Sequence, residues 1–149
     1  MISKILVPTD GSETARKATE YAVGLAKEIG ASLTFLAVID KSPFIGRSIP
    51  SIATPTHLME PVEDYLRQAA EAYLEEVEIL CRKNGVKSKR VIRSGHPVEE
   101  IIKEAKKSKV DLIVMGSHGK SALKAAVLGS VTFGVIHKDT KIPVLVVRR

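Results

Sequence analysis

The sequence predicts an α/β fold in which a parallel sheet is doubly wound and carries helices on both faces. Short, β-branched apolar runs alternate along the chain with longer segments whose apolar residues recur at helical spacing. Strands that alternate with helices form right-handed crossovers into a parallel sheet. The length of 149 residues fits one domain, and no repeat or shift in composition divides the chain. We therefore assign residues 1–149 to a single domain.

The first predicted strand spans Ile2–Val7, an apolar run that suits a strand buried on both faces. Pro8–Ser12 is a turn, and Ser12 is a good N-cap for the helix that follows. Small apolar residues at helical spacing continue this helix to Ile29. Gly30 is placed to end it.

The second predicted strand is Ser32–Ile39. The next twenty residues, Lys41–Glu60, contain three prolines and a glycine and show little periodicity. They predict a long loop, and loops of this length in compact domains are often functional. Pro61 suits the first turn of a second helix, which carries an apolar stripe as far as Leu80. Asn84-Gly85 is placed to end that helix.

The third predicted strand, Val86–Ser94, alternates apolar and basic residues as an outer strand does. The turn Gly95–Pro97 leads into a third helix, and His96 stands at its start. Val110–Met115 is the fourth predicted strand, interrupted by Asp111.

The last third of the chain contains a glycine-rich loop, a helix and a strand. The loop is Gly116–Gly129 and the helix is Ser130–His137, which Gly134 weakens locally. Ile142–Val147 is the last strand, placed at an edge of the sheet. In doubly wound sheets the ligand binds beyond the carboxyl ends of the strands, where the strand order reverses. The turn Pro8–Ser12 and the glycine-rich loop are therefore expected to share one crevice.

Composition excludes several classes of protein. The single cysteine, Cys81, rules out an internal disulfide or a multi-cysteine metal site. No apolar run approaches the ~20 residues of a membrane span, and the first apolar stretch is too short for a signal peptide, so we expect a cytoplasmic protein. The net charge is +6, but aromatic residues make up only 4%, so specific nucleic-acid binding is not expected.

The glycine-rich loop carries the most informative motif. Glycines let backbone N–H groups approach a phosphate, and a helix N-terminus adds further N–H donors. Gly116, Gly119 and Gly129 lie between a buried strand and a helix, and Ser130 and Thr132 add hydroxyl groups. These residues predict a phosphate-binding loop. The alternative is a glycine-rich turn without a ligand.

Two better-known phosphate motifs do not fit this loop. A P-loop ending at Gly119-Lys120-Ser121 needs a glycine five residues before Gly119, where Val114 stands. The dinucleotide fingerprint G-x-G-x-x-G is missing after the first strand. The sequence therefore does not predict a P-loop NTPase or a dehydrogenase.

Gly116, Gly119 and Gly129-Ser130 follow the spacing G-x2-G-x9-G-[ST]. In this motif the chain resembles the ATP-binding branch of the universal stress protein family. The resemblance extends over essentially the whole chain through Lys4–Ser12, Gly95–Pro97, Asp111–Gly119 and Pro143–Val147. It implies a fold like that of the adenine nucleotide α-hydrolases, with five parallel strands in the order 3-2-1-4-5.

The resemblance also implies how ATP is bound. Pro8, Thr9 and Val38 would line the adenine and ribose end, Met115 and Gly116 the ribose side, and Ser117 belongs to the same loop. Asp10, Gly119, Lys120, Gly129, Ser130, Val131 and Thr132 would lie near the phosphates. Lys120 stands where the family more often has Arg, which is not an equivalent phosphate neighbour.

Asp10 has two interpretations. A carboxylate beside phosphates needs a cation between them, so Asp10 is a candidate ligand of Mg²⁺ or, alternatively, Mn²⁺. An Asp before Gly-Ser can also simply shape a turn through its side chain. His118 lies inside the glycine-rich loop and could approach a phosphate. No catalytic triad or structural metal motif is present, so we predict no catalytic residue.

Together these features predict an ATP-binding regulatory protein of the stress response, not an enzyme, with slow or no ATP hydrolysis. One rival is an enzyme of the nucleotide α-hydrolase type that uses ATP to adenylate a substrate. Another is a dimeric interaction module without a ligand. We also expect a homodimer in which Ile142–Val147, a β-branched edge strand, pairs with its copy.

Overall fold

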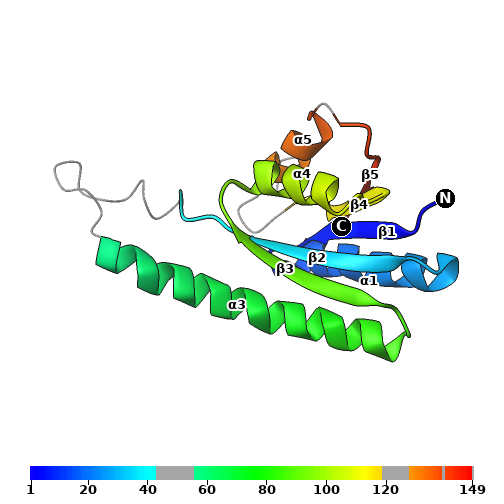
Figure 1. The fold of residues 1–149 in the computed structure, drawn as a ribbon, viewed down its shortest axis with the longest axis horizontal. Coiled ribbons are helices and arrows are strands. Elements are labelled where there is room, and N and C mark those ends of the chain that lie inside the picture. Colours follow the sequence, from blue (N-terminus) through cyan, green and yellow to red (C-terminus); the bar gives the residue numbers. More distant parts are fainter. Residues whose placement is uncertain (43–55, 119–127, 139, 149) are drawn as a thin grey trace.

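The structure is a computed structural model that describes residues 1–42, 56–118, 128–138 and 140–148 (Figure 1). The elements along the chain are β1 (Lys4–Pro8), α1 (Glu13–Ile29), β2 (Ser32–Ile39), α3 (Thr56–Lys83), β3 (Ser88–Ser94), α4 (Pro97–Lys107), β4 (Leu112–Gly116), α5 (Ser130–Ile136) and β5 (Val144–Val147). Five parallel strands pair in the order β3-β2-β1-β4-β5. The predicted fold class and strand order are confirmed, and β3 and β5 are the edges.

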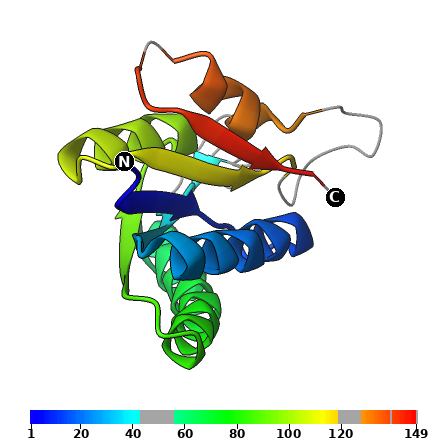
Figure 2. The same cartoon turned by 90° about the vertical axis from the view of Figure 1, so that its right-hand side faces the viewer.

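Helices cover both faces of the sheet, with α1 and α3 on one face and α4 and α5 on the other (Figures 1 and 2). Ile5 and Val7 of β1 pack into the core beneath α1 and α3, whereas Leu6 between them packs beneath α4 and α5. All three side chains are fully buried. Burial on both faces explains why the central strand is apolar from Ile5 to Val7 and does not alternate there.

Helix α1 has the predicted ends. The Ala15 N–H donates to the Ser12 side-chain oxygen over 3.2 Å, and Gly30 closes the helix with a φ of 74°. None of the helices in the described ranges combines the length and the apolar character that a membrane span needs.

Helix α3 begins earlier than predicted. It starts at Thr56, so Pro61 lies inside the helix and not at its first turn. The predicted loop Lys41–Glu60 is therefore wrong over its last five residues, and 43–55 lie outside the described residues. Inside a helix a proline lacks the N–H that would donate to the carbonyl four residues earlier, and its ring crowds that carbonyl, so prolines usually stand in the first turn. Sequence rules place a proline at the start of a helix and miss such an extension.

Three helices end in the same backbone motif. The N–H groups of Ala31, Val86 and Val110 donate to the carbonyls of Ala26, Cys81 and Ala105 respectively, five residues earlier. In each case the residue before the donor has a positive φ: Gly30, Gly85 and Lys109. This is the Schellman arrangement, whose last residue is commonly apolar and packs back on the helix.

The helix ends explain why strands begin later than predicted. Val86 and Val110 are buried and apolar, so the sequence predicts strand residues there. Their N–H groups instead donate to carbonyls at the ends of α3 and α4. The strands β3 and β4 consequently start two residues further on, at Ser88 and Leu112.

The other two late strand starts have local causes. The N–H groups of Ser3 and Lys4 donate to the Asp111 carboxylate over 2.9 and 3.0 Å, so β1 begins at Lys4. These hydrogen bonds hold the pKa of Asp111 below its usual value. The Ile142 N–H similarly donates to the Thr140 hydroxyl over 3.3 Å, before β5 starts.

Gly134 lets α5 approach α4 closely. A Cβ at this position would lie 2.7 Å from Cγ2 of Val98 on α4, which is closer than packing allows. The glycine that weakens α5 as an isolated helix therefore permits its close packing against α4.

Candidate functional site

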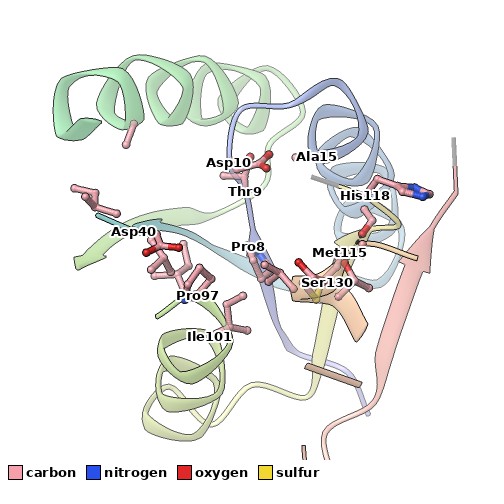
Figure 3. A pocket seen from close by; sticks show the side chains of 18 of the residues that line it. Pro8, Thr9, Asp10, Ala15, Asp40, Pro97, Ile101, Met115, His118 and Ser130 are labelled. Atoms are coloured by element: carbon pink, nitrogen blue, oxygen red, sulfur yellow. Dashed lines mark hydrogen bonds between the residues drawn. The ribbon is translucent and has the colours of Figure 1, made fainter. Parts of the chain in front are cut away.

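A cavity of about 650 Å³ opens at the carboxyl ends of β1, β2 and β4 (Figure 3). The chain runs from β1 outward to β3 on one side and resumes at β4 on the other, so the strand order reverses between β1 and β4. Ligands of doubly wound folds bind at this point. The cavity volume lies in the range of small-molecule sites, roughly 300–1,000 Å³.

Most of the residues predicted to bind ATP line this cavity. They are Pro8, Thr9, Asp10, Val38, Met115, Gly116, Gly129, Ser130, Val131 and Thr132. Residues from distant parts of the chain thus meet in one place, as expected for the shared crevice.

The other predicted residues do not lie in the described wall of the cavity. Ser117 is buried behind it: its N–H donates to the Val147 carbonyl over 3.0 Å, and its hydroxyl lies 2.9 Å from Nδ1 of His118. His118 itself does line the cavity. Gly119 and Lys120 lie outside the described residues.

Sequence reasoning missed the helical walls of the cavity. Leu66, Ala69, Ala70 and Tyr73 contribute from α3, Pro97 and Ile101 from α4, Ala15 from α1 and Phe133 from α5; Leu36, Ile39, Asp40 and Leu128 complete the lining. The helical residues belong to apolar stripes that also build the core, so their pattern predicts burial only. Asp40 could have been predicted from the sequence. It follows the end of β2 as Asp10 follows the end of β1, and both strands end at the same edge of the sheet.

The two sides of the cavity differ: one is lined by apolar side chains beside the Asp40 carboxylate, and the other by hydroxyl and glycine backbone groups beside Met115. In Figure 3, Pro97 and Ile101 lie on the side of Asp40, and Met115 and Ser130 lie on the opposite side of Pro8. A flat apolar group suits the first side. Hydroxyl and glycine backbone groups of the β4–α5 region suit a polar group on the second.

The turn between β1 and α1 is built by its own side chains. The Ser12 N–H donates to Oδ1 of Asp10 over 2.9 Å, and the Gly11 N–H donates to Oγ1 of Thr9 over 3.3 Å. Gly11 has a φ of 76° and packs against the ring of Tyr73. Asp10 therefore does shape the turn, as one interpretation predicted, and it also faces the cavity.

Tyr73 supports this turn from α3. Its hydroxyl donates to the Thr9 carbonyl over 3.4 Å. Burial, and then the negative charge of Asp10, raises the pKa of Tyr73 to about 12. The phenol is thus a neutral hydrogen-bond donor beside the cavity at physiological pH.

The β4–α5 side is locked to the start of α1. A Cβ on Gly116 would lie 2.9 Å from the Thr14 carbonyl oxygen, so only glycine fits there. The Thr14 hydroxyl donates to the His118 carbonyl, and the Thr132 hydroxyl donates to the Gly116 carbonyl over 2.8 Å. Gly116 and Thr132 therefore have structural roles in addition to lining the cavity.

Protein side chains alone do not form a metal site in the described ranges. No group of three or more His, Cys, Asp or Glu side chains lies there in a metal-binding arrangement. A cation beside Asp10 would need further oxygen ligands from a bound molecule.

Comparison with known proteins gives consistent matches. A model described as the universal stress protein family matches residues 1–148. Universal stress protein MJ0577 of Methanocaldococcus jannaschii is 40% identical over 157 positions, covering 100% of this chain and 96% of that protein. Universal stress protein MJ0531 of the same organism is 37% identical over 149 positions, covering 100% and 84%.

Solved structures agree with this fold. The structure of MJ0577 matches with a TM-score of 0.86 and 37% identity, covering 100% of this chain and 97% of that one. Two more distant structures share the fold: a universal stress protein in complex with cAMP (TM-score 0.70, 23% identity, covering 99% and 97%) and one from Archaeoglobus fulgidus in complex with dAMP (TM-score 0.63, 19% identity, covering 98% and 97%). Because the family model matches nearly the whole chain, the protein belongs to the universal stress protein family.

Proposed function

We propose that this protein binds ATP in the cavity at the carboxyl ends of β1, β2 and β4, and that it acts as a regulatory protein of the stress response. The observation that carries the proposal is the cavity itself, since it lies at the reversal of strand order and is lined by most of the residues expected to contact a nucleotide. Its volume and its two chemically different sides suit a base at one end and phosphates at the other.

The lining favours one orientation of the nucleotide. Adenine would lie against Val38 and the apolar residues Pro97 and Ile101. The ribose would then lie near Pro8 and Met115, and the phosphates near Gly129, Ser130 and the undescribed Gly119 and Lys120. This orientation places each residue in the role that the family resemblance implies.

The comparisons support an adenine nucleotide as the ligand class. The two distant universal stress protein structures named above contain cAMP and dAMP, which are both adenine nucleotides. ATP extends this ligand class by further phosphates.

We further propose that Mg²⁺, or alternatively Mn²⁺, bridges Asp10 and the phosphates. The residues fit such an ion only in part, because Asp10 is a single carboxylate and Oδ1 accepts the Ser12 N–H. The nucleotide would supply most of the oxygen ligands.

The arrangement favours binding over hydrolysis. A general base must reach the attacking water with a suitable pKa and an open hydrogen-bonding position. Oδ1 of Asp10 is engaged in the turn, and Nδ1 of His118 lies against the Ser117 hydroxyl. We therefore propose slow or no ATP hydrolysis, with the nucleotide acting as a regulatory ligand.

We also propose a homodimer that forms through β5. This strand is at the edge of the sheet, and Figure 2 shows it beside α5 on the side that faces the viewer. The strand side chains are half-buried, and Phe133 and Ile136 of α5 are exposed large apolar residues. An unpaired β-branched edge is commonly covered by a second chain.

Ser130→Asp tests the ATP site. Ser130 is exposed at the first position of α5, where an acidic residue suits the helix. The added charge would repel phosphates, so we expect ATP affinity without divalent ions to fall at least about tenfold while adenosine affinity stays the same. Isothermal titration calorimetry measures both ligands, and native mass spectrometry identifies any nucleotide retained on purification.

Gly24→Glu is the matched control. Gly24 is exposed on α1, nothing lies within 4 Å of the position that a Cβ would take there, and the variant gains the same negative charge. Equal ATP affinity in Ser130→Asp and Gly24→Glu would exclude the proposed phosphate position. No ATP binding by the unaltered protein would exclude the proposed function.

A further inference from the structure

A second hollow, of about 280 Å³, lies at the opposite end of the sheet from the nucleotide cavity. Its lining residues begin the strands β1, β2 and β3 or follow the end of α4. They are Lys4, Ser32, Leu33, Thr34, Lys87, Ser88, Lys89 and Ser108. No function described above uses this end of the molecule.

The strand register brings two pairs of these residues onto one face of the sheet. Thr34 pairs with Lys89 across the β2–β3 ladder, and Lys4 pairs with Ser32 across β1–β2. Thr34 is two residues before Leu36, so both lie on the face that α4 covers. Because α4 ends at Lys107, this part of the face is left open at the amino ends of the strands.

The hollow is lined by three lysines, and the nearby Asp111 carboxylate is occupied by backbone N–H groups of Ser3 and Lys4. Lys4, Lys87 and Lys89 are exposed, and within the described ranges none of them forms an ion pair. The lining contains no carboxylate. The Ser108 hydroxyl donates to Glu104, but that carboxylate already accepts from Arg93 over 2.8 Å.

Thr34 offers a hydroxyl to the hollow. The residue as a whole is 8% exposed, but its hydroxyl is not among the buried polar atoms without a partner in the described ranges, so the hydroxyl opens to solvent in the hollow that it lines. A ligand there could accept a hydrogen bond from it in place of water.

The end of α4 does not oppose an anion strongly. The carbonyls of Glu104, Ala105 and Lys106 already accept from the N–H groups of Ser108, Val110 and Lys109. The negative end of the helix dipole is therefore largely satisfied by its own backbone.

We propose that this hollow binds a phosphate group, either as inorganic phosphate or as the phosphate of a small molecule. Three lysines supply charge, and the Thr34 hydroxyl, on the same face of the sheet as Lys4 and Lys89, supplies a directed hydrogen bond. The volume leaves room for a small organic group beside the phosphate. This site is separate from the nucleotide cavity and does not depend on the function proposed there.

The test is a titration of the full chain with inorganic phosphate, followed through backbone amide chemical shifts at constant ionic strength. We expect saturable shifts at Thr34 and Lys89 in the millimolar range. Thr34→Val combined with Lys89→Gln should weaken binding at least about tenfold, since it removes one hydroxyl and one charged donor. Lys4→Gln provides a second variant that leaves Thr34 in place.

Lys27→Gln is the control, because it removes one positive charge from the last turn of α1, outside the hollow. It should change phosphate affinity less than about twofold. Shifts that rise linearly without saturation, or an equal loss of affinity in Lys27→Gln, would overturn the site in favour of diffuse attraction.

Two further measurements identify the ligand and separate the sites. Tighter binding of glycerol 3-phosphate than of inorganic phosphate would indicate a phosphorylated small molecule, and equal binding would indicate free phosphate; both support the site. Ser130→Asp should keep the phosphate response at Thr34 unchanged. Its loss in that variant would show that the shifts come from the nucleotide cavity, and would contradict the proposal.

Discussion

Asp10 combines two tasks that different substitutions can separate. Its Oδ1 accepts the Ser12 N–H and fixes the turn, and its charge faces the cavity. An amide oxygen can accept the same hydrogen bond, so Asn preserves the turn without the charge. The pair Asp10→Asn and Asp10→Ala therefore distinguishes a turn residue from a cation ligand.

If Asp10 holds a cation, Asp10→Asn should weaken ATP binding at least about tenfold with Mg²⁺ and much less with EDTA. Asp10→Ala should lower affinity in both conditions because the turn also loosens. Calorimetry with and without Mg²⁺ makes the comparison. The same loss for Asp10→Asn in both conditions would leave Asp10 as a turn residue alone.

Tyr73 should make the free energy of unfolding depend on pH in the alkaline range. Its pKa is about 12 in the folded chain against an ordinary value of 10.0. Between these values the unfolded chain releases a proton that the folded chain keeps, so the free energy of unfolding falls as pH rises through this window. Denaturant unfolding should show a smaller fall in Tyr73→Phe. Parallel pH profiles for the two proteins would show that Tyr73 does not carry this dependence.

At the scale of elements, most of the fold could be predicted because local signals and burial agree. Ser12 and Gly30 bound α1 by capping chemistry that acts within a few residues. The starts of β3 and β4 could not be predicted, because Val86 and Val110 are apolar in the manner of strands while their N–H groups close helices. An apolar residue type indicates that a side chain is buried, but it does not indicate which group accepts the backbone N–H of that residue.

The residues of the site also differ in whether a local sequence signal reveals them. Residues of its loops were visible because glycine, hydroxyl and acidic residues are unusual directly after buried strands. Leu66 and Ile101 could not be predicted as site residues, since the sequence pattern of an apolar helix residue is the same whether it faces a core or a cavity. The cavity wall depends on how helices meet, which the sequence pattern does not encode locally.

Replacing either of two helix glycines by alanine should change the free energy of unfolding, but in opposite directions. At Gly24 a Cβ meets nothing within 4 Å, so Gly24→Ala should stabilise the fold by about 0.5–1 kcal/mol through helix propensity. At Gly134 the Cβ would lie 2.7 Å from Val98, so Gly134→Ala should destabilise by about 1–3 kcal/mol. Thermal unfolding compares both variants with the unaltered protein.

Val98→Ala provides the check on this explanation. It removes both γ-methyl groups, including the Cγ2 that the new Cβ would meet, so the double variant Gly134→Ala with Val98→Ala should be more stable than the sum of the single effects predicts. Simple additivity would refute the close contact as the cause.

At the scale of the whole molecule, the two edges of the sheet differ in charge. The strand β3 carries Lys89, Arg90 and Arg93, and charged edges resist pairing with another chain. The strand β5 consists of Val144–Val147 without a charged residue. The sheet therefore has one edge suited to solvent and one suited to a second copy.

Val146→Lys should convert a dimer to a monomer, because it places a charge at the middle of the β5 edge. Light scattering after size-exclusion chromatography measures the mass at micromolar concentration. Tyr65→Lys, at a residue of α3 that is 71% exposed, is the control and should leave the mass unchanged. A monomeric unaltered protein, or a fully dimeric Val146→Lys, would rule out pairing through β5.

The hydrogen bonds between the Asp111 carboxylate and the chain at the start of β1 bear on how the protein folds during synthesis. The carboxylate holds the N–H groups of Ser3 and Lys4, residues 108 and 107 positions away along the chain. The strand β1 lies at the centre of the sheet, yet its neighbour β4 begins only at Leu112. During synthesis, the 111 residues before β4, about three-quarters of the 149, therefore leave the ribosome with one side of the central strand unpaired. A folding factor that binds nascent strands has its clearest target there until β4 emerges.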